Sequence, residues 1–139
     1  MPLDPTVPRT WLARARSNFR RAEVGRPDAT VFWEELCFDA QQAAEKALKA
    51  VCIHLGVQFP KTHSLVYLMD MIEGAGVKVP ENVKVADALT RYAVDARYPG
   101  FDEDVGEEEY RSAVDLARRV VQWAESVAGQ EGEATAGTS

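Results

Sequence analysis

The sequence predicts an all-α protein, namely an up-and-down four-helix bundle with an additional short helix, five helices in total. Apolar residues recur at steps of three and four along successive stretches, and no stretch alternates with a period of two. Proline and glycine separate these stretches by short connections, which favour antiparallel neighbours. With 139 residues, of which 46% are hydrophobic, the chain can bury one core, and we expect one domain.

The first two predicted helices cover residues 11–22 and 33–55. Thr10 is a suitable N-cap for the first helix. The second is the central helix, and Gly56 is well placed to end it in a left-handed conformation. Small side chains on this helix would let neighbouring backbones come close. They are Ala40, Ala43, Ala44, Ala47 and Ala50.

Three further helices are expected after Pro60. A short one has core positions at Leu65, Leu68, Met69 and Ile72. Pro80 opens a fourth, which the Pro99-Gly100 pair ends and whose apolar register includes Val85, Ala86, Leu89, Tyr92 and Ala93. The fifth runs over residues 107–127, and its inward positions are Tyr110, Ala113, Val114, Ala117, Val120, Val121 and Ala124.

Two pairs of side chains on the central helix have different predicted roles. Cys37 and Cys52 are separated by about 22 Å of helix rise, too far for a disulfide, and we expect buried free thiols. Phe38 and Ile53 lie on the opposite, otherwise polar side, where a lone bundle has little reason to leave apolar residues. These two residues predict a dimer interface.

Charge and composition exclude several classes of function. The net charge of −6 argues against broad, salt-driven binding of duplex nucleic acid. Six arginines within residues 1–26 nevertheless leave a local phosphate site possible. The chain has no apolar run near 18 residues and no apolar leader, so we expect a soluble, cytoplasmic protein that does not bind a membrane. Its two histidines and two cysteines cannot form a structural zinc site, and we expect no metal and no cofactor.

Two segments carry candidate anion-binding residues. Residues 91–100, RYAVDARYPG, place arginines and tyrosines around a Pro-Gly turn, where arginine can bind phosphate and tyrosine can stack on a base. Packing of Tyr92 in the core, with Arg97 at the end of a helix, explains the same residues equally well. His63 precedes a helix and lies close to Lys61, so it could meet an anion, although N-terminal capping also accounts for this segment.

Three motifs in order closely resemble the HEPN family. They are CFDAQQAAEKALKA at residues 37–50, PKTHSL at residues 60–65 and ARYP at residues 96–99. The resemblance extends over residues 8–128, and it implies a five-helix fold, commonly a homodimer. It also implies a gene encoded beside a minimal nucleotidyltransferase, for which such domains were once regarded as the substrate-binding subunit. Residues 129–139 have nothing to bury, and we expect them to form a disordered tail.

The sequence departs from the catalytic members of that family. Many relatives are metal-independent endoribonucleases and toxins that use an arginine followed, four to six residues later, by a histidine. Arg97 matches the arginine, but no histidine follows it in that window. His63 from another helix or from a dimer partner, or Asp102 as a weaker base, could in principle replace the missing histidine.

The expected function is therefore a non-catalytic HEPN-domain protein. It would bind a nucleotide, act as partner subunit of a minimal nucleotidyltransferase, or do both, as in a toxin–antitoxin-type pair. The predicted nucleotide- or anion-binding residues are Arg97, Tyr98, Lys46, Lys49, Lys61, His63 and Arg91. The alternative is a metal-independent endoribonuclease toxin that acts on RNA through Arg97, with His63 as its catalytic partner.

Overall fold

The computed structural model describes residues 4–93 and 105–129, and within these ranges all regular secondary structure is helical. The helices are α1 (Pro8–Glu23), α2 (Trp33–His54), α3 (Leu65–Gly74), α4 (Glu81–Lys84), the 3₁₀ helix η1 (Val85–Ala93) and α5 (Glu107–Ala128). The predicted fold class is confirmed. None of these helices has the length and apolar character required to cross a membrane. The predicted tail lies, apart from Gly129, outside the described residues.

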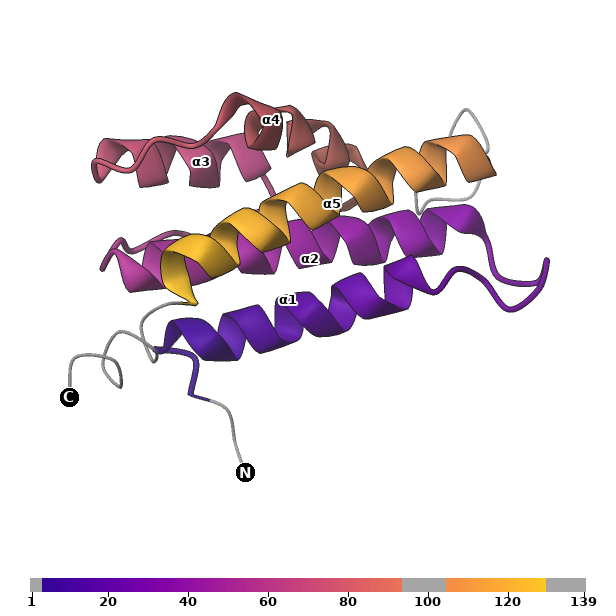
Figure 1. Cartoon of the computed structure of the whole chain (residues 1–139), viewed down its shortest axis with the longest axis horizontal. Helices are drawn as coiled ribbons and strands as arrows, with labels where there is room; N and C mark the ends of the chain where they lie inside the picture. Colours follow the sequence, from indigo (N-terminus) through magenta and orange to yellow (C-terminus); the bar gives the residue numbers. More distant parts are fainter. Residues whose placement is uncertain (1–3, 94–104, 130–139) are drawn as a thin grey trace.

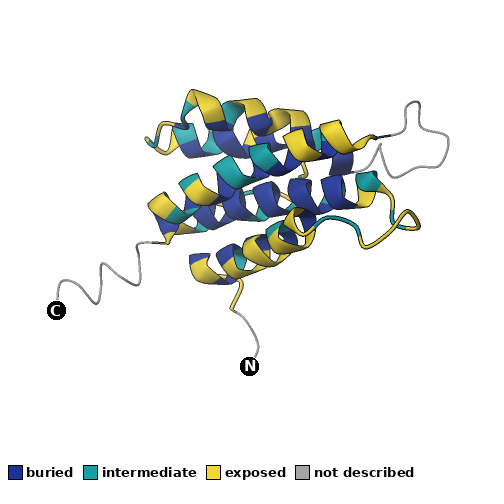
Figure 2. Cartoon of the chain, turned by 45° about the vertical axis from the view of Figure 1, so that its right-hand side comes forward, coloured by how far each residue is buried: buried dark blue, intermediate teal, exposed yellow. Residues whose placement is uncertain are grey.

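Helix α2 is the centre of the bundle. It contacts α1, α3, η1 and α5. Helices α1 and α2 run antiparallel, and α5 begins at the same end of the bundle as α2 (Figure 1). The buried faces of these helices are turned towards one another, and their exposed faces form the outer surface (Figure 2).

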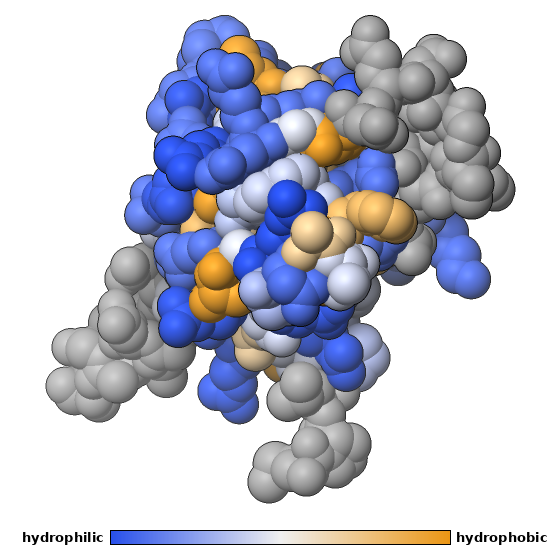
Figure 3. Space-filling model, turned by 90° about the vertical axis from the view of Figure 1, so that its right-hand side faces the viewer, coloured by the Kyte–Doolittle hydropathy of each residue, from blue (hydrophilic) through white to orange (hydrophobic). Residues whose placement is uncertain are grey.

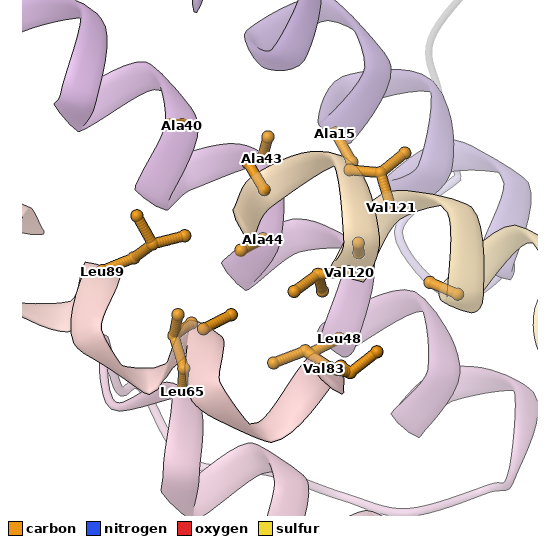
Figure 4. Close-up of a cluster of buried hydrophobic side chains, with 14 of the residues drawn as sticks. Ala15, Ala40, Ala43, Ala44, Leu48, Leu65, Val83, Leu89, Val120 and Val121 are labelled. Atoms are coloured by element: carbon orange, nitrogen blue, oxygen red, sulfur yellow. The ribbon is translucent and has the colours of Figure 1, made fainter. Parts of the chain in front are cut away.

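The alanines of α2 allow this close packing, as the sequence predicts. Ala40, Ala43, Ala44, Ala47 and Ala50 are all fully buried. Figure 4 shows Ala43 and Ala44 within a cluster to which α1 contributes Ala15 and α5 contributes Val120 and Val121. Larger side chains from the other side of the bundle, including Leu65 and Leu89, complete this core.

The prediction that Thr10 caps the first helix is wrong. Helix α1 begins at Pro8, Val7 occupies the N-cap position, and Thr10 is a buried residue inside the first turn. Proline is favoured at the first helical position because its φ angle is already helical and its missing N–H would have no partner there. Pro8 therefore starts the helix before Thr10 is reached.

The predicted fourth helix is present but differs in type. It has one short α-helical segment, α4, and continues as η1. The buried side chains Val83, Ala86, Leu89 and Tyr92 are three residues apart, which places them on one line of a 3₁₀ helix with three residues per turn. Val85, predicted to face the core, is 53% exposed. The apolar spacing of three, rather than an alternation of three and four, explains both differences.

The predicted end of α2 at Gly56 is confirmed. Gly56 has a φ of 71°, which favours glycine over residues with a Cβ atom. Its N–H donates to Ile53 O at 3.1 Å, and Val57 N–H donates to Cys52 O at 2.9 Å. These two bonds form the Schellman motif, which satisfies the last carbonyl groups of the helix.

Both cysteines are free and buried, as predicted. Burial raises the pKa of the Cys37 thiol to about 12, with nearby Glu109 adding to the shift. Burial likewise raises the pKa of Cys52 to about 11. Such thiols behave as small apolar side chains of the core, because the reactive thiolate form is disfavoured.

Candidate functional site

Several polar side chains of α2 are buried rather than solvent-exposed. Asp39, Gln41, Glu45 and Lys49 each retain at most 9% of their accessible surface. Burial of a charge or an amide is costly unless the group is hydrogen-bonded or paired. The hydrogen-bond and ion-pair partners of these side chains therefore show which segments are tied to α2 by polar contacts.

Glu45 is the hub of the first group. Its Oε2 atom accepts a hydrogen bond from Lys49 Nζ at 2.8 Å, and its Oε1 atom accepts one from Gln41 Nε2 at 2.9 Å. The Nδ1 atom of His63 lies 2.9 Å from the same Oε1 atom. Gln42 Nε2 donates to Gln41 Oε1 at 2.7 Å. We call Gln41, Gln42, Glu45, Lys49 and His63 the α2 polar cluster.

The electrostatics of the cluster keep Glu45 ionised. Burial raises the pKa of this carboxyl group, but hydrogen bonds from Lys49, Gln41 and His63 together outweigh burial, so its pKa lies below the ordinary value. The negative charge of Glu45 is therefore retained inside the bundle, where the lower dielectric strengthens its attraction for Lys49.

Two aromatic rings cover the ammonium group of Lys49. Its Nζ atom lies 5.8 Å from the ring centroid of Trp11 and 5.5 Å from that of Phe59. The two rings meet edge to face, with centroids 6.1 Å apart. Because Glu45 and both rings surround it, Lys49 is fixed as part of the interior, and this predicted anion-binding residue is already paired.

The loop before α3 carries His63 to the cluster. Gln41 Nε2 lies 3.4 Å from the backbone oxygen of His63 and donates to it, so the histidine is attached to α2 through its backbone as well as its ring. Its side chain is 59% exposed. Lys61, two residues earlier in the same loop, is also exposed. His63 is thus in contact with the cluster through Nδ1 and exposed over most of its side chain.

The N-terminus of α3 is closed by side chains. Ser64 Oγ accepts from Tyr67 N–H, as an N-cap residue does. From η1, Thr90 Oγ1 accepts from Leu65 N–H and Asp87 Oδ1 accepts from Val66 N–H, both at 3.2 Å. These amide groups already have hydrogen-bond acceptors. For the backbone of this segment, the geometry therefore supports N-terminal capping rather than anion binding.

Lys46 belongs to a separate polar network between α1 and α2. Its Nζ atom donates to Asn18 Oδ1 at 2.8 Å, and Asn18 Nδ2 donates to Asp39 Oδ1 at 3.1 Å. Arg21 Nε lies 3.4 Å from the second oxygen of Asp39. Burial, followed by the nearby charge of Arg14, lowers the pKa of Lys46. This lysine is held against α1.

The remaining predicted binding residues lie near the end of η1 or beyond the described ranges. Arg91 Nη1 pairs with Glu109 Oε2 at 2.9 Å. The hydroxyl group of Tyr92 also donates to Glu109, and Tyr92 is buried, as the core-packing interpretation predicts. Arg97 and Tyr98 lie outside the described residues, as does Asp102.

The structure thus joins Lys49 and His63 through one carboxylate, places Lys61 in the same loop as His63, and puts Lys46 and Arg91 in two other networks. Glu45 and Gln41 were not predicted from the sequence. The spacing of Glu45 and Lys49, four residues with the acid first, is a readable signal for a helical ion pair. No local signal links His63 to α2.

In the described part of the chain, no group of three or more His, Cys, Asp or Glu side chains is arranged to hold a metal ion.

Comparison with known proteins agrees with this helical architecture. The family model for the HEPN domain matches residues 8–127. The chain therefore belongs to the HEPN domain family. Comparison with the curated proteins gives no match.

Two solved structures are similar to this chain. The crystal structure of TT1696 from Thermus thermophilus is 32% identical, with a TM-score of 0.66. The crystal structure of ST0689, described as an archaeal HEPN homologue, is 20% identical, with a TM-score of 0.68. Each alignment covers 86% of this chain and 96% of the other. The second likeness, at its low identity, supports the fold alone.

Proposed function

We propose that this chain is a non-catalytic HEPN subunit that binds a nucleotide and serves as the partner of a minimal nucleotidyltransferase, in a toxin–antitoxin-type pair. Membership of the HEPN family supports the class of function. The observation that carries the nucleotide-binding part is the position of His63, whose Nδ1 atom lies against a buried carboxylate while 59% of its side chain is exposed.

This arrangement suits a phosphate group. A protonated imidazole donates from both nitrogen atoms, so His63 can bind Glu45 through one and a phosphate oxygen through the other. Hydrogen bonds between charged groups are about twice as strong as those between neutral groups. Lys61 is exposed in the same loop and can supply a second cation. Lys49 contributes indirectly, because it pairs with the second oxygen of Glu45 and so leaves Oε1 for His63.

The nucleotide-binding part is tested by calorimetric titration of the purified chain with ATP, GTP and AMP. We expect His63→Ala to weaken binding at least tenfold, since loss of a charged hydrogen bond costs about 1.5–3 kcal/mol. Lys61→Ala should weaken it less, because an exposed cation contributes less. His54→Ala and Lys78→Ala are matched controls, since both residues are exposed and neither belongs to the α2 polar cluster.

Each part of the proposal can fail separately. The absence of binding by the unmodified chain at millimolar nucleotide would refute nucleotide binding. Equal affinity of the His63→Ala and His54→Ala variants would refute the assigned site. The partnership is tested by co-expression with the nucleotidyltransferase encoded by an adjacent gene, and two proteins that migrate separately in gel filtration would refute it.

A homodimer remains part of the proposal. Phe38 and Ile53 are both only half-buried within the described chain, so each retains surface that a second copy could cover. We expect Ile53→Glu to shift the chain towards a monomer in sedimentation velocity. A monomer at all concentrations of the unmodified chain would refute this interface.

The second candidate is a metal-independent endoribonuclease, with His63 as the base and Arg97 as the cation. The specific observation in its favour is that Glu45 orients the His63 ring, as a carboxylate orients the catalytic histidine of a triad. If this candidate is correct, expression arrests growth, and Arg97→Ala relieves the arrest. Intact RNA after long incubation with the purified chain would exclude it.

A further inference from the structure

A hollow of about 440 Å³ lies at the end of the bundle where α1 ends and where α2 and α5 begin. This end faces the viewer in Figure 3, where hydrophilic surface borders small apolar patches. The hollow shares no residue with the α2 polar cluster. Its volume lies at the lower end of the range of small-molecule sites, about 300–1,000 Å³.

Three arginines and two glutamates line the hollow. Each glutamate has a cationic partner: Glu107 Oε2 lies 2.6 Å from Arg111 Nη2, and Glu23 Oε1 lies 3.4 Å from Arg20 Nη1. Arg111 is thereby largely neutralised, and Arg20 does not line the hollow. Arg26 and Arg118 are the other two guanidinium groups that line the hollow.

Arg26 is held in place without an ion pair among the described residues. Its guanidinium carbon lies 4.1 Å from the ring centroid of Trp33, and Nη1 donates to Val31 O at 3.1 Å. The Trp33 ring lies in turn against Tyr110, with centroids 4.8 Å apart. Gly25, with a φ of 82°, turns the chain at the end of α1 and so brings Arg26 to this stack. A guanidinium group that is fixed in advance loses little entropy when it binds an anion.

Arg118 is the second of these guanidinium groups. Its carbon atom lies 5.5 Å from the ring centroid of Phe19. Its Nη1 atom forms an ion pair and a hydrogen bond with Asp115 Oδ1 at 3.4 Å, and the other carboxylate oxygen of Asp115 lies closer to Arg119 Nη2, at 2.7 Å. Because Asp115 is shared between two arginines, it neutralises Arg118 only in part.

We infer that this hollow binds the phosphoryl group of a small phosphate ester, with Arg26 and Arg118 as its two guanidinium ligands. A phosphate dianion has enough oxygen atoms to accept paired hydrogen bonds from two guanidinium groups at once. A carboxylate has only two oxygen atoms for the same donors. The hollow is larger than a phosphate ion, and Val24 and Val114 line part of it, so the organic part of an ester has apolar surface to cover. This site goes beyond the function proposed above, since it uses neither His63 nor Lys61.

The test is calorimetric titration of the full chain with inorganic phosphate, pyrophosphate, AMP and adenosine at low ionic strength. We expect the three phosphates to bind and adenosine not to bind. Tighter binding of AMP than of inorganic phosphate would identify the ligand as an ester, whereas equal affinities would identify it as free phosphate, and both outcomes support a phosphoryl site. Adenosine that binds as well as AMP would overturn it.

Variants locate the site. Arg26→Met and Arg118→Met keep the length of the side chain but remove its charge, and each should weaken phosphate binding about tenfold or more. Arg26→Lys should weaken it by a smaller factor, because the charge remains but the fork is lost. Arg9→Met is the matched control, since Arg9 is exposed on α1 and does not line the hollow. Far-ultraviolet circular dichroism confirms that each variant is folded.

The result can be separated from the function proposed above. If His63→Ala abolishes phosphate binding while Arg26→Met and Arg118→Met bind normally, the arginine hollow is overturned and the His63 site is supported. If phosphate binding depends on Arg26 and Arg118 and His63→Ala leaves nucleotide binding unchanged, the hollow stands and the His63 site does not.

Discussion

Glu45 and His63 lie on different elements, 18 residues apart, yet Oε1 of the carboxylate is 2.9 Å from Nδ1 of the imidazole. The same carboxylate binds Lys49 through its other oxygen. One buried acid therefore connects a lysine within the bundle to a histidine at the surface. Changes at Glu45 are expected to affect both the stability of the bundle and the position of His63.

Removal of Glu45 should strongly destabilise the fold. We expect Glu45→Ala to lower the free energy of unfolding by about 3–5 kcal/mol, because Lys49 is left as a buried charge without its partner. The double variant Glu45→Ala/Lys49→Met should recover part of this loss, since it removes both charges. Urea denaturation of both variants and of the unmodified chain measures these changes, and a double variant less stable than Glu45→Ala would contradict a paired interaction.

Acid should destabilise the bundle in part through the same residue. The pKa of Glu45 is lowered in the folded state, so its contribution is present above the unfolded value, near 4.5, and is lost as the pH falls through the folded value. We expect Glu45→Gln to show a shallower loss of stability with falling pH below about 4.5. Equal slopes for the variant and the unmodified chain in thermal melts between pH 3 and pH 6 would contradict this expectation.

Alkali should destabilise the bundle through ionisation of the Cys37 thiol. The pKa of the buried thiol is raised to about 12 from an unfolded value near 9.0, so its contribution is complete below pH 9 and is lost as the pH rises towards the folded value. In this window the unfolded chain releases a proton that the folded chain retains, which costs about 1.4 kcal/mol per pH unit. Cys37→Ala should reduce the slope of stability against pH between 9 and 11, as measured by urea denaturation under reducing conditions.

The 3₁₀ register of η1 predicts opposite results at two apolar positions. Leu89 is buried, and Leu89→Ala should cost about 2–5 kcal/mol. Val85 is 53% exposed, and Val85→Ala should change stability by less than about 0.5 kcal/mol. An α-helical register with Val85 facing the core would instead make both substitutions costly, and chemical denaturation distinguishes the two.

The sequence alone was sufficient for the architecture. The positions of α2 and α5, the inward faces of both helices and the close approach at the alanines follow from apolar periodicity, because burial of a stripe requires its residues to recur once per turn. The end of α2 was predictable from Gly56, since few residues other than glycine adopt its φ. The start of α1 at Pro8 and the 3₁₀ geometry of η1 were harder to predict from the sequence. Thr10 is also a suitable N-cap, and apolar residues spaced by three fit an α-helix as well as a 3₁₀ helix.

Only the tertiary structure decided how the residues of the candidate sites are arranged. His63 meets Glu45, and Arg26 stacks on Trp33 beside Tyr110, because the loop before α3 and the turn at Gly25 return the chain to α2. These are contacts between segments that no local period relates, and their energy depends on burial and on distance in space. The sequence therefore determined which residues are helical and which faces are apolar, while folding determined which charges are paired inside and which remain available to a ligand.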